Sequence, residues 1–139
     1  MEQFKQQKNY DDNAFGKYVR MRREKLGLSC RQLAKKLGMT PSYLSDIENG
    51  IRKAPTRSLK GRDYMAGFIK YLQIRECDVV FFYELALASR DFDPCIRNYI
   101  KFNTSAKTAL HLAKEVNLSD EEWKKIINYI VETKINSEQ

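Results

Sequence analysis

The 139-residue sequence lacks most of the features that mark catalysis, metal binding or a membrane span. Its only histidine, His111, has no cluster of cysteines and carboxylates at metal-ligand spacing beside it. No glycine-rich loop could cradle a phosphate. No window approaches the roughly 18 consecutive apolar residues that a membrane helix needs. We therefore expect neither enzymatic activity nor a cofactor, and no contact with a membrane.

The cysteines are few and unpaired in sequence. They are Cys30, Cys77 and Cys95, and no two of them form a CxxC pair. An odd number without metal-type spacing is typical of reduced thiols in a cytosol. The polar start of the chain, MEQFKQQKNYDDN, has no apolar core of a secretory leader. These observations predict a cytoplasmic protein.

The net charge of +7 is unevenly distributed. Residues 1–62 carry 15 Lys and Arg against 6 Asp and Glu, whereas residues 63–139 carry 10 against 12. A basic first half indicates that any contact with a polyanion belongs there. The alternative is that these lysines and arginines only solubilise helices.

The hydrophobic pattern predicts an all-α fold. Apolar residues recur at three and four positions, and proline occurs only at 41, 55 and 94. We expect a mobile arm over residues 1–12, a helical domain over 13–89 and a helical extension over 90–139. The helices expected in the domain cover about 13–26, 29–38, 40–49, 63–72 and 76–89.

Residues 29–50, SCRQLAKKLGMTPSYLSDIENG, have the form of a helix-turn-helix. Gly38 suits the turn, because glycine adopts a positive φ without steric cost. Ala34 is small where two steeply crossing helices would meet. The apolar residues expected to face inward are Leu33, Leu37, Leu44 and Ile47.

The second helix of this unit has a polar outer face. At 100° per residue, placing Leu44 at zero puts Ile47 at about 300° and Ile51 at about 340°. The opposite side then carries Ser42, Asp46 and Asn49, with Ser45 on its flank. A helix of this kind can enter the major groove of DNA.

The run from Gly27-Leu28 through QLAKKLG, TPSYLS and IENG resembles the lambda-repressor/Cro-like (XRE-type) helix-turn-helix family. The resemblance covers about residues 13–89 and implies a five-helix domain whose third helix reads DNA. It assigns base contacts to Pro41, Ser42 and Asp46, with Tyr43 and Ser45 beside them. It also implies a structural ion pair between Arg23 and Glu48, and a phosphate contact at Asn49.

Three positions depart from the family pattern. Cys30 stands where many members have a glutamine that helps to hold a phosphate. Pro41 offers only apolar contact, for example to a thymine methyl group. Asp46 would repel phosphates, although a carboxylate can accept a hydrogen bond from cytosine N4. The alternative for Asp46 is a surface charge near Arg52 or Lys53.

Basic side chains flank the predicted reading face and suit phosphate contact, which gives affinity and register without sequence information. We expect roughly half of these eight to touch DNA: Arg31, Lys35, Lys36, Arg52, Lys53, Arg57, Lys60 and Arg62.

The last predicted helix carries the strongest amphipathic pattern. Its apolar residues, which we call the Trp123 stripe, are Trp123, Ile126, Ile127, Ile130 and Val131. The favoured interpretation is that the stripe belongs to the intrachain core. The alternative is a dimer contact.

The sequence thus predicts a sequence-specific regulator of transcription from a bacterium or phage. We expect it to bind double-stranded DNA as a homodimer on a palindromic operator and to act as a repressor. One alternative is an antitoxin whose C-terminal helices bind a toxin, which an exposed Trp123 stripe would favour. Another is a protein-interaction module without DNA binding.

Overall fold

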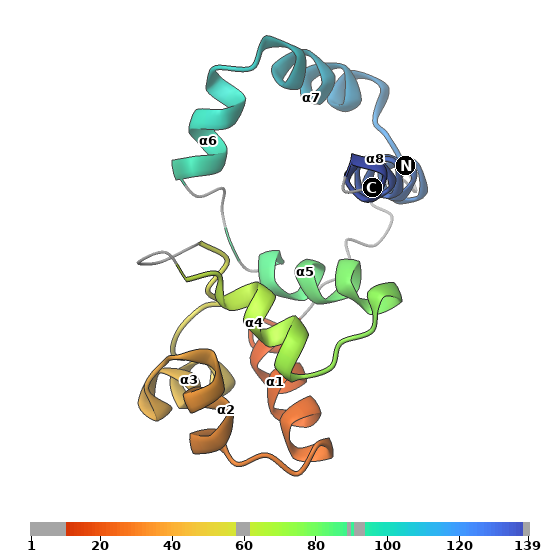
Figure 1. The fold of residues 1–139 in the computed structure, drawn as a ribbon. Coiled ribbons are helices and arrows are strands. Elements are labelled where there is room, and N and C mark those ends of the chain that lie inside the picture. Colours follow the sequence, from red (N-terminus) through yellow and green to blue (C-terminus); the bar gives the residue numbers. More distant parts are fainter. Residues whose placement is uncertain (1–10, 58–61, 89, 91–93, 138–139) are drawn as a thin grey trace. The chain divides into compact units, whose positions relative to one another are not determined.

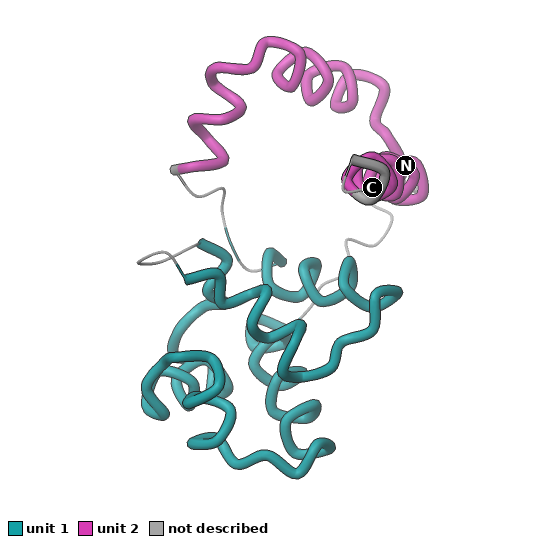
Figure 2. The backbone as a smooth tube through the Cα atoms, in the orientation of Figure 1, with its two compact units in different colours: residues 1–91 teal, residues 92–139 magenta. Residues whose placement is uncertain are grey.

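The computed structural model describes residues 11–57, 62–88, 90 and 94–137. The regular structure of these residues is helical, which confirms the predicted all-α fold (Figure 1). The chain divides into two units, residues 1–91 and 92–139 (Figure 2). Most of the predicted arm, residues 1–10, lies outside the described residues, as does Lys60.

Unit 1 contains five α-helices and one short 3₁₀ turn. They are α1 (Ala14–Lys25), α2 (Cys30–Leu37), α3 (Pro41–Glu48), α4 (Tyr64–Tyr71), η1 (Glu76–Asp78) and α5 (Val79–Leu87). The predicted fifth helix therefore begins as a 3₁₀ turn, and the other four helices lie within a few residues of their expected bounds.

Side-chain caps fix the two helices of the helix-turn-helix. The Ser29 hydroxyl accepts from the Gln32 amide at 3.0 Å, and the Ser29 amide donates to the Gln32 side chain at 2.8 Å, which is a capping box at the start of α2. Thr40 accepts from the Tyr43 amide at the start of α3. Between them Gly38 has φ +75°, the left-handed conformation that the turn requires.

The core of unit 1 lies where the five helices meet. Leu33 and Ala34 of α2 and Leu44 of α3 are fully buried. The rings of Phe15, Phe68 and Phe82 join α1, α4 and α5, with Phe15 and Phe68 in an edge-to-face arrangement at 5.7 Å. Such aromatic pairs stabilise a core beyond the area they bury, by about 0.5–1.5 kcal/mol each. The helix-turn-helix thus shares one hydrophobic core with α1, α4 and α5.

Helix α1 approaches the C-terminal end of α3 at Gly16. A Cβ atom on Gly16 would lie 2.3 Å from the Ile47 carbonyl oxygen and 2.9 Å from that of Glu48. Nearby, the Asn13 side-chain amide donates to the Glu48 carbonyl at 3.1 Å. The absence of a side chain at residue 16 therefore lets backbone meet backbone between the two helices.

The helical angle of about 340° assigned to Ile51 was wrong. Helix α3 ends at Glu48, and Gly50 follows with φ +77°, so the helical angle assigned to Ile51 does not apply. Its side chain is 73% exposed instead of facing the core.

Unit 2 consists of α6 (Pro94–Lys101), α7 (Thr104–Val116) and α8 (Asp120–Ser137). Asn103 caps α7 by accepting from the Ala106 amide, and the Ser119 hydroxyl accepts from the Glu122 amide before α8. Ala113 is the one buried side chain among those described in this unit.

The core of unit 2 does not include the Trp123 stripe, so its interpretation as intrachain core stays a prediction only for packing against unit 1. Trp123 is 36% exposed and Ile130 is 61% exposed, and Ile126 and Val131 are also exposed. The stripe forms on one face of α8, as the spacing predicts, and the described residues of unit 2 do not bury it.

None of the helices described combines the length and the apolar composition that a bilayer crossing requires.

Candidate nucleic-acid interface

An ion pair joins α1 to the end of α3. Arg23 donates from Nε to Glu48 Oε2 at 2.9 Å and from Nη2 to Oε1 at 2.8 Å, and its Nη1 donates to the Leu28 carbonyl. The Glu48 side chain is 2% exposed and that of Arg23 11%. The two residues that the resemblance paired thus form a two-bond, largely buried contact.

Electrostatics around this pair favour the charged form of Arg23. The hydrogen bond to Glu48 raises the pKa of Arg23, against the opposite effect of burial. Arg20, on the outer side of α1, places its Nε 3.5 Å from Glu48 Oε1. Glu48 therefore interacts with two arginines of α1, which fix the orientation of α3.

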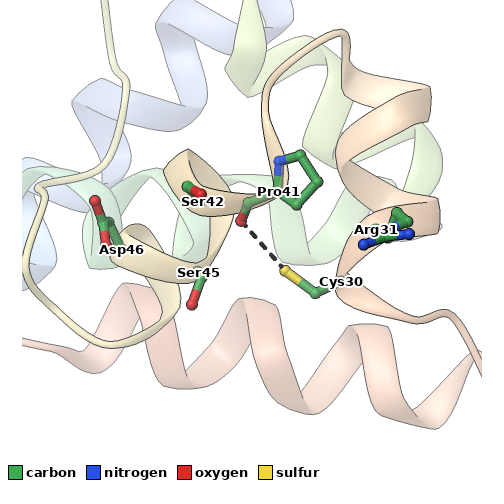
Figure 3. Close-up of a pocket in the computed structure, with 6 residues that line it drawn as sticks. All are labelled: Cys30, Arg31, Pro41, Ser42, Ser45 and Asp46. Atoms are coloured by element: carbon green, nitrogen blue, oxygen red, sulfur yellow. Dashed lines mark hydrogen bonds between the residues drawn. The ribbon is translucent and has the colours of Figure 1, made fainter.

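The N-terminal end of α2 and the outer face of α3 border an open hollow of about 450 Å³. Its lining residues are Cys30, Arg31, Pro41, Ser42, Ser45 and Asp46 (Figure 3). The Cys30 thiol donates to the Pro41 carbonyl across it at 3.7 Å. Four of the five predicted base-reading residues and one predicted phosphate contact therefore lie around a single surface depression.

Asp46 is held by a residue of the following loop. Arg52 Nε lies 3.5 Å from Asp46 Oδ2, and the Arg52 amide donates to the Asp46 carbonyl at 3.1 Å. Both side chains retain access to solvent. The alternative interpretation of Asp46 predicted this pairing with Arg52. Arg52 offsets the negative charge of Asp46, and the Asp46 side chain still lines the hollow.

Tyr43, the fifth predicted base-reading residue, lies away from the hollow. Its ring packs 6.1 Å from that of Tyr64, and the Arg52 guanidinium lies 5.6 Å from its centre. Burial raises the pKa of the Tyr43 hydroxyl, and Tyr64 adds to the effect. Tyr43 thus packs against Tyr64 and contacts the Arg52 guanidinium in this structure.

Asn49 is exposed at the end of α3, where its side-chain amide donates to the Ser45 hydroxyl at 3.3 Å. The amide of Asn49 also closes the helix by donating to the Ser45 carbonyl. The residue is accessible for the predicted phosphate contact.

The predicted phosphate contacts differ in their surroundings. Arg31, Lys35, Lys36, Arg52, Lys53, Arg57 and Arg62 are all exposed. Arg62 donates to the Gly38 carbonyl and so closes over the turn between α2 and α3. Lys36 lies 5.6 Å from the Tyr71 ring centre.

The sequence did not predict the positions of two basic residues: Arg20, which lies beside Glu48, and Lys70 of α4. The Lys70 ammonium lies 5.3 Å from the same Tyr71 ring as Lys36, so α4 adds a positive charge beside α2. These lysines border a second hollow of about 200 Å³. No signal in the sequence links Lys70 to α2, because their contact depends on how α4 packs.

Comparison with known families agrees with this geometry. Residues 14–61 match a family model described as a helix-turn-helix domain. The match spans α1, α2 and α3 and the loop that follows them. A search of curated proteins and a search of solved structures returned no significant match. This part of the chain is therefore a helix-turn-helix domain, the class of domain that commonly binds DNA.

Proposed function

We propose that this protein is a sequence-specific DNA-binding regulator of transcription, of the XRE type, which acts as a homodimer on a two-fold operator and represses by occupying it. The observation that carries the proposal is the hollow between α2 and α3. Its rim offers hydroxyl groups at Ser42 and Ser45 and a carboxylate at Asp46, which are groups that pair with base edges.

The charge distribution supports the same function. The exposed basic residues of α2 and of the loop after α3 belong to the part of the chain that carries the excess positive charge. Lys70 extends this set to α4. Contacts from such residues to phosphates would supply affinity and register, and the hollow would supply sequence preference.

A homodimer follows from the size of the reading helix. Helix α3 has eight residues and can reach only a few base pairs. Two copies related by a two-fold axis would read two half-sites about 34 Å apart, or a multiple of that spacing.

Selection of bound duplexes from a random pool tests the proposal. We expect enrichment of one sequence with two-fold symmetry. Failure of every duplex to bind at low salt would contradict DNA recognition and support an interaction module instead.

One observation favours a second candidate, an antitoxin. The exposed Trp123 stripe is the feature by which a toxin-binding helix would differ from a core helix. Co-purification of a tightly bound second protein with the full chain, lost when Ile130 is replaced, would support this candidate.

A further inference from the structure

Unit 2 has too small a core to account for its own helices. It comprises 48 residues, and Ala113 is the buried side chain among those described. Ordering a residue costs about 1–2 kcal/mol of backbone entropy, and domains of this size are marginal even when well packed. The three helices must therefore gain most of their stability from a surface that covers them.

The uncovered surface is apolar. Eleven large apolar side chains of unit 2 are exposed: Ile96, Tyr99, Phe102, Leu110, Leu112, Val116, Trp123, Ile126, Tyr129, Ile130 and Val131. Soluble monomers rarely expose so many in so short a segment, and such surfaces mark interaction sites.

The charge of unit 2 fits a second copy of the same unit. Residues 92–139 carry seven Lys and Arg and seven Asp and Glu, so the unit is neutral. A neutral surface meets no net repulsion from its own copy, and it offers no net attraction to a strongly charged partner.

The face of α8 is self-complementary when two copies run antiparallel. At 100° per residue, Asp120 lies about 60° and Lys134 about 20° from the direction of Trp123, so both fall on the side of the stripe. Asp120 precedes Ile127 by seven residues and Lys134 follows it by seven. Antiparallel packing about Ile127 therefore puts Asp120 of each copy opposite Lys134 of the other.

Three apolar residues of the stripe, Trp123, Ile127 and Val131, obey the same symmetry. Trp123 precedes Ile127 by four residues and Val131 follows it by four. The large ring of each copy thus faces the smaller valine of the other, while Ile127 faces itself. Parallel packing would instead place like charges together at both ends of the stripe, at Asp120 and at Lys134.

We propose that α8 pairs with α8 of a second copy in an antiparallel, two-fold arrangement through the Trp123 stripe. This rests on the proposed homodimer and names the surface that forms it. A stable interface buries about 800 Å² on each partner. One face of an 18-residue helix, roughly 27 Å by 10 Å, supplies only part of that, so exposed apolar residues of α6 and α7 must complete it.

Light scattering and tryptophan fluorescence of the full chain test the pairing. Trp123 is the only tryptophan, so its emission reports on this surface alone. We expect a dimer whose emission shifts to longer wavelength on dilution, as Trp123 becomes exposed. A monomer at all concentrations, or a dimer that dissociates without a change in emission, would overturn the proposal and assign the stripe to another protein or to the chain's own first unit.

A matched pair of variants locates the contact. Ile130→Glu, on the stripe, should raise the dimer dissociation constant at least about 30-fold. Asn128→Glu adds the same charge on the exposed opposite side of α8 and should leave the dissociation constant unchanged. Equal effects of the two variants, at equal helix content by circular dichroism, would contradict the assigned face.

Charge exchange tests the antiparallel direction without touching the apolar stripe. Asp120→Lys and Lys134→Asp should each weaken the dimer, and the double variant should restore it. The absence of restoration would exclude this register.

DNA binding provides an independent readout. Ile130→Glu should keep its affinity for a duplex with one half-site and lose the cooperative gain on a two-fold site. A wild-type dimer that binds no DNA would refute DNA recognition but not the interface. A monomer that binds a half-site would refute the interface and the homodimer but would leave DNA recognition standing.

Discussion

Arg23 of α1 donates to both carboxylate oxygens of Glu48, the last residue of α3. The contact is almost closed to water, and it sets the direction in which α3 presents Ser42 and Asp46. The orientation of the surface that we propose to read DNA therefore depends on Arg23 and Glu48, whose paired side chains are largely buried.

Glu48→Gln should destabilise unit 1 by about 3 kcal/mol, because the substitution leaves the Arg23 charge in a largely buried site without its counter-ion. The melting temperature should fall by about 10 °C or more. Glu24→Gln is the matched control, since Glu24 is exposed and 3.9 Å from Arg20. Equal melting temperatures for the two variants would place the Arg23–Glu48 pair in solvent.

Gly16→Ala should destabilise unit 1 by about 1–3 kcal/mol, because the added methyl group would meet backbone carbonyls that cannot move aside independently. Gly27→Ala provides the comparison. Gly27 has φ +70° and open space around it, so that variant carries only backbone strain of about 1 kcal/mol. Denaturant unfolding measures both, and a smaller loss at Gly16 than at Gly27 would contradict the close helix approach.

Lys53→Ala with Arg57→Ala should weaken DNA binding for all sequences alike. The slope of log affinity against log salt should fall by about 0.9 for each phosphate contact removed. Lys107→Ala with Lys114→Ala removes the same charge from exposed positions of α7 and should leave the slope unchanged. Titrations at several salt concentrations distinguish the two, and an unchanged slope for the first pair would remove the loop from the interface.

Ser42→Ala with Asp46→Ala should change which duplexes are selected more than it changes total affinity. Both side chains line the hollow, and a lost base contact costs about 1–3 kcal/mol of discrimination. The double variant at Lys53 and Arg57 is the control, because it should lower the affinity for DNA and keep the sequence preference. Selection from a random pool measures both, and an unaltered consensus would refute the reading face.

Cys30 should react with alkylating reagents more slowly than Cys77 and Cys95, which are exposed. Burial raises the pKa of the Cys30 thiol, and the Glu48 carboxylate raises it further, so less of the reactive thiolate is present near pH 8. Bound DNA should slow the reaction of Cys30 alone, because this thiol lines the hollow. Mass spectrometry of timed reactions measures all three rates, and protection of Cys95 instead would contradict the assigned surface.

Local signals were enough to predict much of unit 1. Ser29, Thr40 and Gly38 mark helix ends through chemistry confined to a few neighbouring residues, so their roles are legible in sequence. Ile51 was misplaced because the angle calculation continued a helix past Gly50. The close approach at Gly16 was not predicted, since it depends on how two separate helices pack.

Partner choice was harder to predict than helix position. The spacing from Trp123 to Val131 defines an apolar face. The same face could pack against the chain's own core, against a second copy of the chain or against another protein. Likewise, helical spacing was enough to predict that Ser42 and Asp46 lie on one side of α3. The packing of Tyr43 against Tyr64 could not be predicted, because it depends on how α4 lies against α3. The pairing of Asp46 with Arg52 depends on a loop whose path periodicity does not describe.

The thiol of Cys30 touches the backbone of Pro41, so α2 and α3 build the rim of the hollow together. If the hollow reads DNA as we propose, an effort to change the sequence preference would accordingly gain little from randomising α3 alone. A library that varies Cys30 and Arg31 along with Ser42 and Asp46 would sample changes in the shape of the rim, which substitutions on one helix cannot reach.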